Sequence, residues 1–530
     1  MDFFKKNKSL LLLFFLVTAG TFLRFYNLNW GSPFYFHPDE RNIASSVSQL
    51  NFPKQLNPHF FAYGSFPIYL IYLLGIFSNI IHHHDLAFVS FENAVISSRI
   101  ISAVLSVFLI PLLYILGQEL KDKTVGILAS FFAATSVGFI QFAHFGTFEV
   151  WLTTLGILLF YTCLRIVNNL TFGKIIIASI LLGLLLSTKL SSLALIPLPL
   201  LSIFFAKKNI NFHRRLIYVL PIIPIAVFIS IATSPFYIFD YFSFQSSIRY
   251  ESSVALGTLP VFYTGSFFNT APVLFQFKKV YPFLLNPFIT FIFIPSFLYL
   301  LLFSLRQKVI SYRLLIFSFS LLFFSQVFFF AKWTRYMIPT LPFVYLMVAI
   351  FLSAILKYKT KFSYFLIFLS VASNIIFIYS FFKTVYINPD TRIEASVFVK
   401  EQIPADEKIL SEVYDMGITP FNRYFNNIIL YNFYDLDNGF NTLDLENNSY
   451  NYIIVPSQRI FESRYLHGKE FPNGYNFYKS LMLQKEYKKI YETPCDILCK
   501  IIYLGSPIFS FEQTANVFDR PTIMIFKKII

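Results

Sequence analysis

Long apolar runs alternate with short polar segments over roughly the first 383 residues of the chain. Most runs approach the length of about 20 residues that a helix needs to cross the hydrocarbon core of a bilayer. This pattern predicts an α-helical polytopic membrane protein. Twelve runs can be distinguished, at residues 9–25, 65–81, 96–117, 125–143, 150–167, 175–187, 190–206, 216–233, 286–304, 314–330, 341–356 and 363–381.

The positions of lysine and arginine decide which of these runs cross the membrane. If all twelve crossed, every later basic cluster would face outward, although Lys and Arg prefer cytoplasmic loops. Omitting 65–81 places them all inside, and the start of this run, with Pro67 and several tyrosines, suits a helix that lies in the interface. We therefore expect eleven spans. The clusters are Lys121 and Lys123; Lys207, Lys208, Arg214 and Arg215; Arg306, Lys308 and Arg313; and Lys357, Lys359 and Lys361.

The first run has the features of a retained signal anchor. It follows Lys5, Lys6 and Lys8 and lacks a small-residue cleavage site, so the N-terminus is expected in the cytoplasm. With eleven spans, the chain beyond the last run then lies outside the cell.

The composition changes near residue 384, where charged residues, Asn and Asp return. The stretch TRIEASVFVKEQIPADEKILSEVYD predicts a helix, a turn at Pro404 and a β-strand. We therefore expect a transmembrane domain over 1–383 and an extracytoplasmic soluble α/β domain over 384–530.

Composition and charge support a membrane protein and argue against a nucleic-acid partner. Apolar residues make up 56% of the 530 positions and charged residues only 13%, far from a soluble average. The net charge of +15 comes from the short basic clusters between apolar runs, so it reflects topology. Cys163 lies in an apolar run, whereas Cys495 and Cys499 are close enough to pair if their segment faces an oxidising compartment.

Acidic residues are rare in this chain, and several fall at the predicted outer ends of spans. Asp39 and Glu40 occur in FHPDERNIA after the first span, and Glu149 ends the third span on the same face. Twelve spans would instead separate Glu149 from Asp39 by a bilayer. Glu251, in the outer loop 234–285, is a further candidate acid. A solvated loop would also explain an exposed acidic pair, so the carboxylates alone do not define a function.

Four stretches, in this order, resemble the motifs of the C-type (GT-C) glycosyltransferases. These membrane enzymes use lipid-phosphate sugars, and the resemblance is closest to the protein O-mannosyltransferase and aminoarabinose transferase branches. The family more often has Asp where this chain has Glu149. The first motif has two parts in one loop, GSPFYFHPDE and LNPHFFAYGSFPIYL, and the other three are AHFGTFEVWLT, LLSTKLSSLALIPLPLL and AKWTRYMIPTLPF.

The resemblance implies a GT-C fold and the transfer of a sugar, with mannose as one candidate, from a polyprenyl-phosphate donor to a protein, glycan or lipid acceptor. The transfer would take place at the outer face of the cell membrane, with 26–95 as the outer catalytic loop. An inverting transfer needs a carboxylate to take the acceptor proton and cations to hold the phosphate. We expect Asp39 to be the base, Glu40 to orient it, and Glu149 to bind the acceptor or a divalent cation such as Mg²⁺ or Mn²⁺.

Cations at the outer ends of spans are the expected phosphate ligands. Arg335, with Lys332 nearby, is the natural anchor because a guanidinium offers two parallel donors to a phosphate. Lys189 lies between two spans on the disfavoured outer face, which either contact with the phosphate or interfacial anchoring would explain.

Aromatic residues and histidines near the acidic motifs are expected to line the cavity. Tyr63, Tyr336 and His59 are candidates for contact with the substrate, although tyrosines at a bilayer boundary need no such role. His37 and His144 also lie near the motifs. The run His82, His83 and His84 could bind a metal or form a polar turn, and none of these spacings matches a zinc motif.

Other functions remain open at this stage. An aminoarabinose-type transferase acting on lipid or polysaccharide is the second enzyme interpretation. A transporter or flippase would explain many spans, but it predicts ionisable residues near the bilayer midplane or inverted repeats, and the sequence shows neither.

Overall fold

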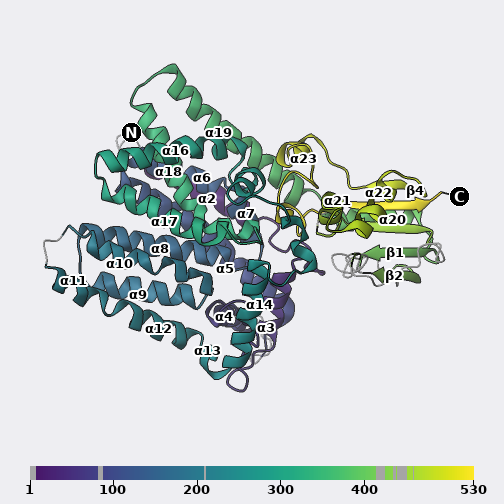
Figure 1. Cartoon of the computed structure of the whole chain (residues 1–530), viewed down its shortest axis with the longest axis horizontal. Helices are drawn as coiled ribbons and strands as arrows, with labels where there is room; N and C mark the ends of the chain where they lie inside the picture. The colour runs from purple at the N-terminus through teal and green to yellow at the C-terminus, as the bar shows by residue number, and fades with distance from the viewer. Residues whose placement is uncertain are drawn as a thin grey trace.

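A helical bundle makes up most of the molecule, and a smaller sheet domain projects from one of its ends (Figure 1). In Figure 1 the chain starts at the side of the bundle away from the sheet domain and ends at the far tip of that domain. The computed structural model describes residues 8–81, 88–207, 211–412, 424–431, 433, 437, 450–456 and 459–529.

The bundle is built from the apolar runs of the sequence. Their inner faces form one continuous apolar core. Their outer faces also carry large apolar side chains, for example Phe14 and Phe365, as expected for helices that contact lipid. The elements are α2 (Lys8–Phe25), α5 (Phe91–Leu120), α6 (Lys123–Ala134), α7 (Val137–His144), α8 (Glu149–Asn168), α9 (Phe172–Leu186), η1 (Leu190–Leu195), α10 (Pro197–Phe204), α11 (Phe212–Val219), α12 (Ile222–Thr233), α16 (Pro287–Arg306), α17 (Ile310–Val327), η4 (Thr334–Thr340), α18 (Leu341–Leu356), α19 (Lys361–Phe382) and η5 (Lys383–Ile387).

The expected number of eleven spans is too high by the criterion of helix length. Among the described residues, eight helices are long and apolar enough to cross a membrane, or nine if α6 and α7, bent by 47°, form one span. The difference comes from Phe172–Leu186 and Leu190–Phe204, which are apolar but shorter than the others. At 1.5 Å per residue each reaches only about 22 Å, short of a hydrocarbon core of about 30 Å. Both still pack beside α8 in the bundle.

The run that we expected to lie in the interface forms α4 (Ser65–Ile81), which is shorter than the candidate spans. It packs against α5 and α3 (Pro38–Ser48), near the end of the bundle that carries the sheet domain (Figure 1). The amide of Ser65 donates to Ser234 Oγ over 2.9 Å, which ties its start to the segment 234–285. That segment holds α13 (Phe236–Phe239), α14 (Tyr241–Leu256), η2 (Phe262–Phe267), η3 (Gln276–Val280) and α15 (Tyr281–Leu284).

The basic turns of the bundle are linked to one another by contacts. Lys121 Nζ donates to Ser353 Oγ over 3.0 Å, and Lys207 Nζ donates to Asn168 Oδ1 over 3.0 Å. Arg165, near the end of α8, pairs with Glu119, near the end of α5, over 3.5 Å, so the turns after these two helices are also joined. The turns after α5, α8, α10 and α18 therefore lie at the same end of the bundle.

The sheet domain follows α19 and has helices on both faces of a five-stranded sheet of order β2-β1-β3-β5-β4. Strand β1 runs parallel to β2 and β3, whereas β5 runs antiparallel to β3 and β4. The elements are α20 (Thr391–Gln402), β1 (Lys408–Glu412), β2 (Asn427–Tyr431), β3 (Tyr452–Pro456), α21 (Phe461–Leu466), α22 (Pro472–Met482), β4 (Tyr487–Glu492), α23 (Ile497–Ile502), η8 (Gln513–Ala515) and β5 (Ile523–Lys528).

Alternation along the strands divides the apolar core of this domain into two layers. On β3, Ile454 faces a cluster with Ala395 and Val399 of α20. The next position, Ile453, faces the opposite cluster with Phe461 of α21. The sheet therefore lies between α20 and the pair α21 and α22.

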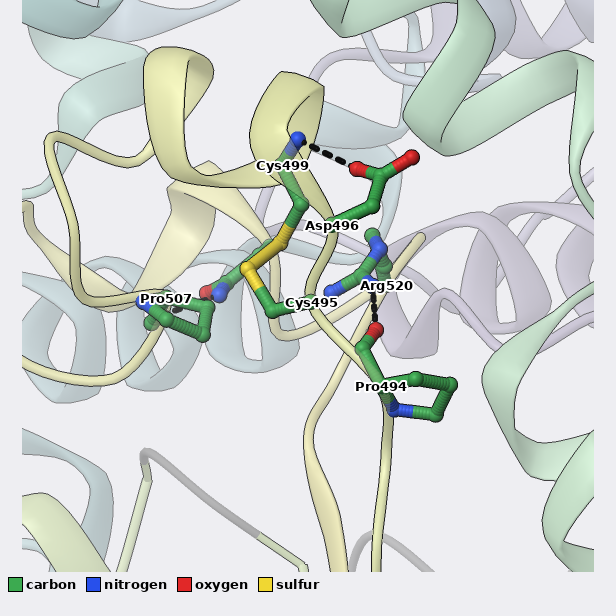
Figure 2. The surroundings of a disulfide bond; sticks show 7 residues. Pro494, Cys495, Asp496, Cys499, Pro507 and Arg520 are labelled. Carbon is green, nitrogen blue, oxygen red and sulfur yellow. Dashed lines mark hydrogen bonds between the residues drawn. A yellow bond between two sulfur atoms is a disulfide. The ribbon is translucent and has the colours of Figure 1, made fainter.

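The chain between β4 and β5 returns to the bundle. Helix α23 packs against α19, and Tyr503 and Phe511 belong to the apolar core of the bundle. Cys495 and Cys499 form the disulfide that their spacing suggested (Figure 2). This returning segment ties the sheet domain to the end of the bundle where the first loop lies.

Candidate active site

Helix α3 carries the acidic pair at its N-terminus. His37 is the N-cap residue, Pro38 occupies the first turn, and the carboxylates of Asp39 and Glu40 lie where the helix dipole favours negative charge. Consecutive residues of a helix point about 100° apart. As a result, Asp39 lines the cavity described below, whereas Glu40 is fully buried beneath it.

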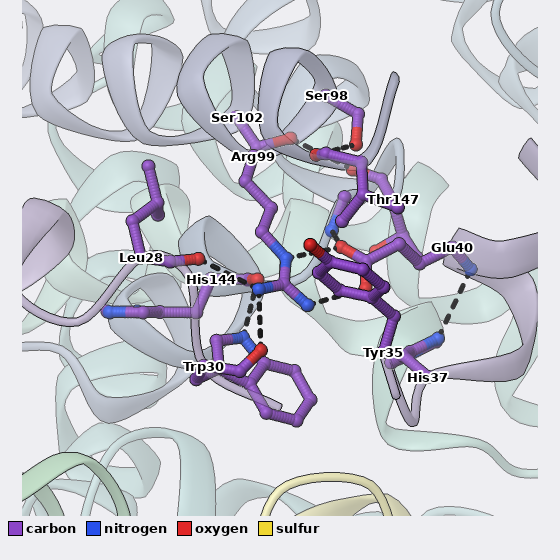
Figure 3. A network of polar contacts seen from close by, with 12 residues as sticks. Leu28, Trp30, Tyr35, His37, Glu40, Ser98, Arg99, Ser102, His144 and Thr147 are labelled. Carbon is purple, nitrogen blue, oxygen red and sulfur yellow. Dashed lines mark hydrogen bonds and ion pairs between the residues drawn. The ribbon is translucent and has the colours of Figure 1, made fainter. Parts of the chain in front are cut away.

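Glu40 is held by a buried ion pair with Arg99 of α5 (Figure 3). Arg99 donates from Nε and Nη2 to the two carboxylate oxygens over 2.6 and 2.7 Å, and the Gly146 amide adds a third bond of 3.0 Å. Arg99 also donates to the carbonyls of Leu28 and Trp30 over 2.8 and 2.9 Å. The pair thus joins the first loop, α5 and the turn before α8, and it fixes the start of α3.

Asp39 forms an ion pair with Arg335, which comes from η4. The guanidinium of Arg335 also lies 4.6 Å from the centre of the Trp333 ring. Burial alone would raise the pKa of Asp39, but the positive charges around it, led by Arg335, outweigh burial and the net shift is downward. The carboxyl is therefore held ionised, as a general base has to be.

Glu149 and Lys189 form a second acid–base pair in the same cavity. Lys189 Nζ lies 3.9 Å from Glu149 Oε1 and 5.0 and 5.7 Å from the ring centres of Tyr63 and Tyr336. Burial lowers the pKa of Lys189, and the charge of Glu149 opposes that effect. Neither oxygen of Glu149 accepts a hydrogen bond from any residue that the structure describes, although the side chain is 2% exposed.

These residues line one cavity of about 630 Å³ where the bundle meets the sheet domain. Glu251 of α14 also faces it, and burial raises the pKa of that carboxyl. The turn before α21 supplies Arg459 to the wall, and the chain that returns between β4 and β5 supplies Gln513 and Phe518. A second, small pocket of about 20 Å³ adjoins the cavity at Lys189 and Arg335, and apolar side chains line most of it, among them Leu152, Leu195, Leu322 and Pro339.

Six of the nine expected site residues line this cavity, namely Asp39, Glu149, Lys189, Arg335, Tyr63 and Tyr336. Glu40, Lys332 and His59 do not. Lys332 is buried and donates to the Phe330 carbonyl over 3.1 Å. His59 lies outside the cavity, where its Nε2 is 2.9 Å from Gln55 Nε2 and its Nδ1 is 3.7 Å from Asp240 Oδ2.

Of the histidines near the motifs, some line the cavity and others do not. His37 lines the cavity. His144 is buried and stacks on Tyr386 with ring centres 3.8 Å apart. The run from His82 to His84 lies outside the described residues.

Arg99 and Arg459 were not expected in the site. Arg99 falls inside a predicted span, where a single arginine within SSRIISA gives no hint of its partner. Arg459 lies far along the chain and reaches the cavity only through the tertiary fold.

In the part of the chain that the structure describes, no group of three or more His, Cys, Asp and Glu side chains is arranged to hold a metal ion. Glu149, expected to bind the acceptor or a divalent cation, lies beside Lys189, and the nearby carboxylate of Asp39 pairs with Arg335. These partners already compensate the charge that a divalent ion would need. The site therefore does not fit Mg²⁺ or Mn²⁺ without a rearrangement.

No family model matches the sequence, and no curated protein matches it. Among solved structures, the oligosaccharyltransferase of Archaeoglobus fulgidus in its apo form is similar over 100% of this chain and 90% of its own, with a TM-score of 0.56 and 14% identity. The same enzyme, tethered to an acceptor peptide with an NVT sequon, gives a TM-score of 0.51 over 100% and 89% at 14% identity. The chain has the GT-C fold.

This result confirms the fold that the four sequence motifs implied. A weaker likeness, with a TM-score of 0.46 and 10% identity over 98% of both chains, joins it to ArnT from Cupriavidus metallidurans bound to undecaprenyl phosphate. That score is too low to support an argument. At these identities the GT-C fold is established, and the chemistry has to be argued from the cavity itself.

Proposed function

We propose that this protein is a glycosyltransferase that moves a sugar from a polyprenyl-phosphate donor to a protein, glycan or lipid acceptor at the membrane surface. One observation carries the proposal: a carboxylate, Asp39, and three cations, Lys189, Arg335 and Arg459, line a single cavity at the end of a membrane bundle. A transfer of this kind needs a base for the acceptor and positive charge for the phosphate that leaves.

The donor fits the cavity in one orientation. Its phosphate lies at Arg335 and Lys189, the former with a planar pair of donors and the latter as a point charge. Its prenyl chain follows the apolar side chains Leu152, Leu195 and Leu322 of the small adjoining pocket, which has to widen to take the chain. The sugar then occupies the wider part of the cavity, which Asp39, Phe518 and Glu251 line.

The reaction is a displacement at the anomeric carbon. The acceptor oxygen bonds to C1 of the sugar while the bond from C1 to the phosphate oxygen breaks, and the electron pair of that bond leaves with the phosphate. Asp39 takes the proton of the acceptor, and Arg335 and Lys189 stabilise the charge on the released polyprenyl phosphate. Glu149 holds Lys189 in place, and Glu40 positions α3 through Arg99.

The orientation in the membrane belongs to the same proposal. The basic turns after α5, α8, α10 and α18 face the cytoplasm by the positive-inside rule, which puts the cavity and the sheet domain outside the cell. A disulfide between Cys495 and Cys499 is consistent with an oxidising compartment on that side. The N-terminus then lies in the cytoplasm, as in a signal anchor.

The test is incubation of the purified protein with a panel of labelled polyprenyl-phosphate sugars and measurement of released polyprenyl phosphate. Mannose and aminoarabinose donors distinguish the two enzyme interpretations. Release that depends on one sugar and on an acceptor supports the proposal. If the protein releases no phosphate but moves the intact lipid across proteoliposomes, it is a flippase instead.

A further inference from the structure

His37 is a cavity residue to which the proposed transfer assigns no role. It lies directly before Pro38 and Asp39, lines the same cavity, and is 3% exposed. Its ring packs against Phe145, with ring centres 4.5 Å apart, and against Phe518 of the C-terminal chain, with ring centres 4.1 Å apart. These two contacts hold the plane of the imidazole ring.

One ring nitrogen of His37 is already used by the protein. The amide of Glu40 donates to Nδ1 over 3.4 Å, which caps α3 (Figure 3). Because Nδ1 accepts this bond, the proton of a neutral ring lies on Nε2. Burial lowers the pKa of His37 to about 3, so the ring is neutral at physiological pH.

The second nitrogen has no protein partner. In the part of the chain that the structure describes, no residue accepts a hydrogen bond from Nε2 of His37. The side chain is largely buried, so an N–H donor that faces the cavity is completed only by a ligand or by water, and leaving it open costs free energy. In the proposed complex the phosphate already has Arg335 and Lys189 as ligands, which leaves a hydroxyl oxygen as the acceptor for this N–H.

We propose that Nε2–H of His37 donates a hydrogen bond to a hydroxyl oxygen of the transferred sugar and so contributes to the choice of donor. The inference rests on the proposed function, since it names a contact of the same substrate. Phe518 belongs to the returning chain, so the sheet domain helps to hold the ring that recognises the sugar. The acceptor hydroxyl, which meets Asp39, is the other possible partner, and the test distinguishes the two.

Two substitutions separate the cap from the ligand contact. His37→Asn keeps an oxygen near the position of Nδ1, and Asn is a good N-cap residue, but it has no group at Nε2. His37→Gln places an amide near Nε2 but caps the helix poorly. If His37 only caps α3, His37→Asn should keep both stability and donor discrimination, and His37→Gln should lose stability. If His37 contacts the sugar, His37→Asn should lose donor discrimination and His37→Gln should keep it.

The experiment measures kcat/KM for polyprenyl-phosphate hexose, its epimers and its single deoxy analogues, with thermal unfolding in detergent. For His37→Asn we expect unchanged unfolding, a loss of about fivefold to tenfold in kcat/KM for the preferred donor, and loss of discrimination against one deoxy analogue only. His37→Gln should unfold at lower temperature yet keep that discrimination. His59→Gln, outside the cavity, is the control and should change neither.

Binding measurements with the wild-type protein keep the two proposals apart. If it binds polyprenyl phosphate but gains nothing from the hexose, the sugar contact is wrong while the phosphate site stands. If it binds neither lipid, the proposed function fails and the His37 contact with it. A His37→Asn protein that keeps its donor discrimination, or that changes only the KM for the acceptor, also overturns the proposal.

Discussion

Arg335 donates from Nη1 to Oδ2 of Asp39 and so joins the first long loop to a residue 296 positions later in the chain. The proposed base and the proposed phosphate ligand are therefore in contact before any donor binds. An incoming phosphate would compete with Asp39 for the same guanidinium. Donor binding would thus release the carboxylate and make it a stronger base at the moment when the acceptor has to be deprotonated.

Asp39→Asn removes the base with almost no change in shape. We expect a loss of at least about 10²-fold in turnover, because an amide cannot take the acceptor proton. Polyprenyl phosphate should bind at least as tightly as to the wild type, since Arg335 is no longer neutralised. Turnover at the wild-type rate with normal donor binding would show that Asp39 is not the base.

Arg335→Lys keeps the charge and loses the planar fork, so donor binding should weaken, and Arg335→Ala should weaken it further. Arg335 is the leading positive charge that lowers the pKa of Asp39, so its removal raises that pKa. The base works only when ionised, and the acid limb of the kcat/KM profile should therefore move to higher pH in Arg335→Ala. Arg249→Ala, an exposed arginine on α14 that does not line the cavity, is the matched control.

The variant Glu40→Gln tests whether Glu40 acts through its buried ion pair with Arg99 and not as a catalytic group. The substitution leaves the charge of Arg99 buried without its partner, which we expect to cost about 3 kcal/mol of unfolding free energy. The midpoint temperature of thermal unfolding should fall further than it does in Asp39→Asn. The double variant Glu40→Gln with Arg99→Gln should recover part of the loss, and a double variant no better than the single one would contradict the pairing.

The residues that could be anticipated are those that mark the ends of apolar runs. Asp39, Glu149, Lys189 and Arg335 each lie in or beside a predicted outer loop between apolar runs, and membrane topology alone brings such positions to one face. The burial of Glu40 could not be seen in this way, because it depends on where α3 begins.

Other features depend on tertiary structure alone. Arg459 reaches the cavity from the turn between β3 and α21 and Phe518 from the chain that returns before β5, and no local pattern signals either contact. Fewer helices pass the length criterion than there are apolar runs, for a related reason. An apolar run shows that a segment is buried or faces lipid, but in η1 and α10 it does not give the length of a continuous helix.

Glu462 provides a stability test at the junction between the sheet domain and the bundle. Burial raises the pKa of the Glu462 carboxyl to about 8. The charge of Lys279 opposes this shift, and the charge of Glu512 adds to it. An unfolded chain loses this proton near pH 4 to 5, so stability should fall as pH rises from about 5 to 8, by at most about 1.4 kcal/mol per unit. Glu462→Gln should flatten this dependence in thermal unfolding, whereas the exposed Glu486→Gln should not.

Membrane orientation can be tested with two exposed positions at opposite ends of the molecule, Lys123 at the start of α6 and Leu483 after α22. The native cysteines do not interfere, because Cys163 is buried and the other two form the disulfide. With an impermeant thiol reagent on intact cells, Leu483→Cys should be labelled and Lys123→Cys should be labelled only after permeabilisation. The reverse pattern would place the basic turns outside and the cavity inside. The donor lipid would then have to present its sugar at the cytoplasmic face, and the proposal of an outer-face transferase would fail even if Asp39 and Arg335 keep their roles.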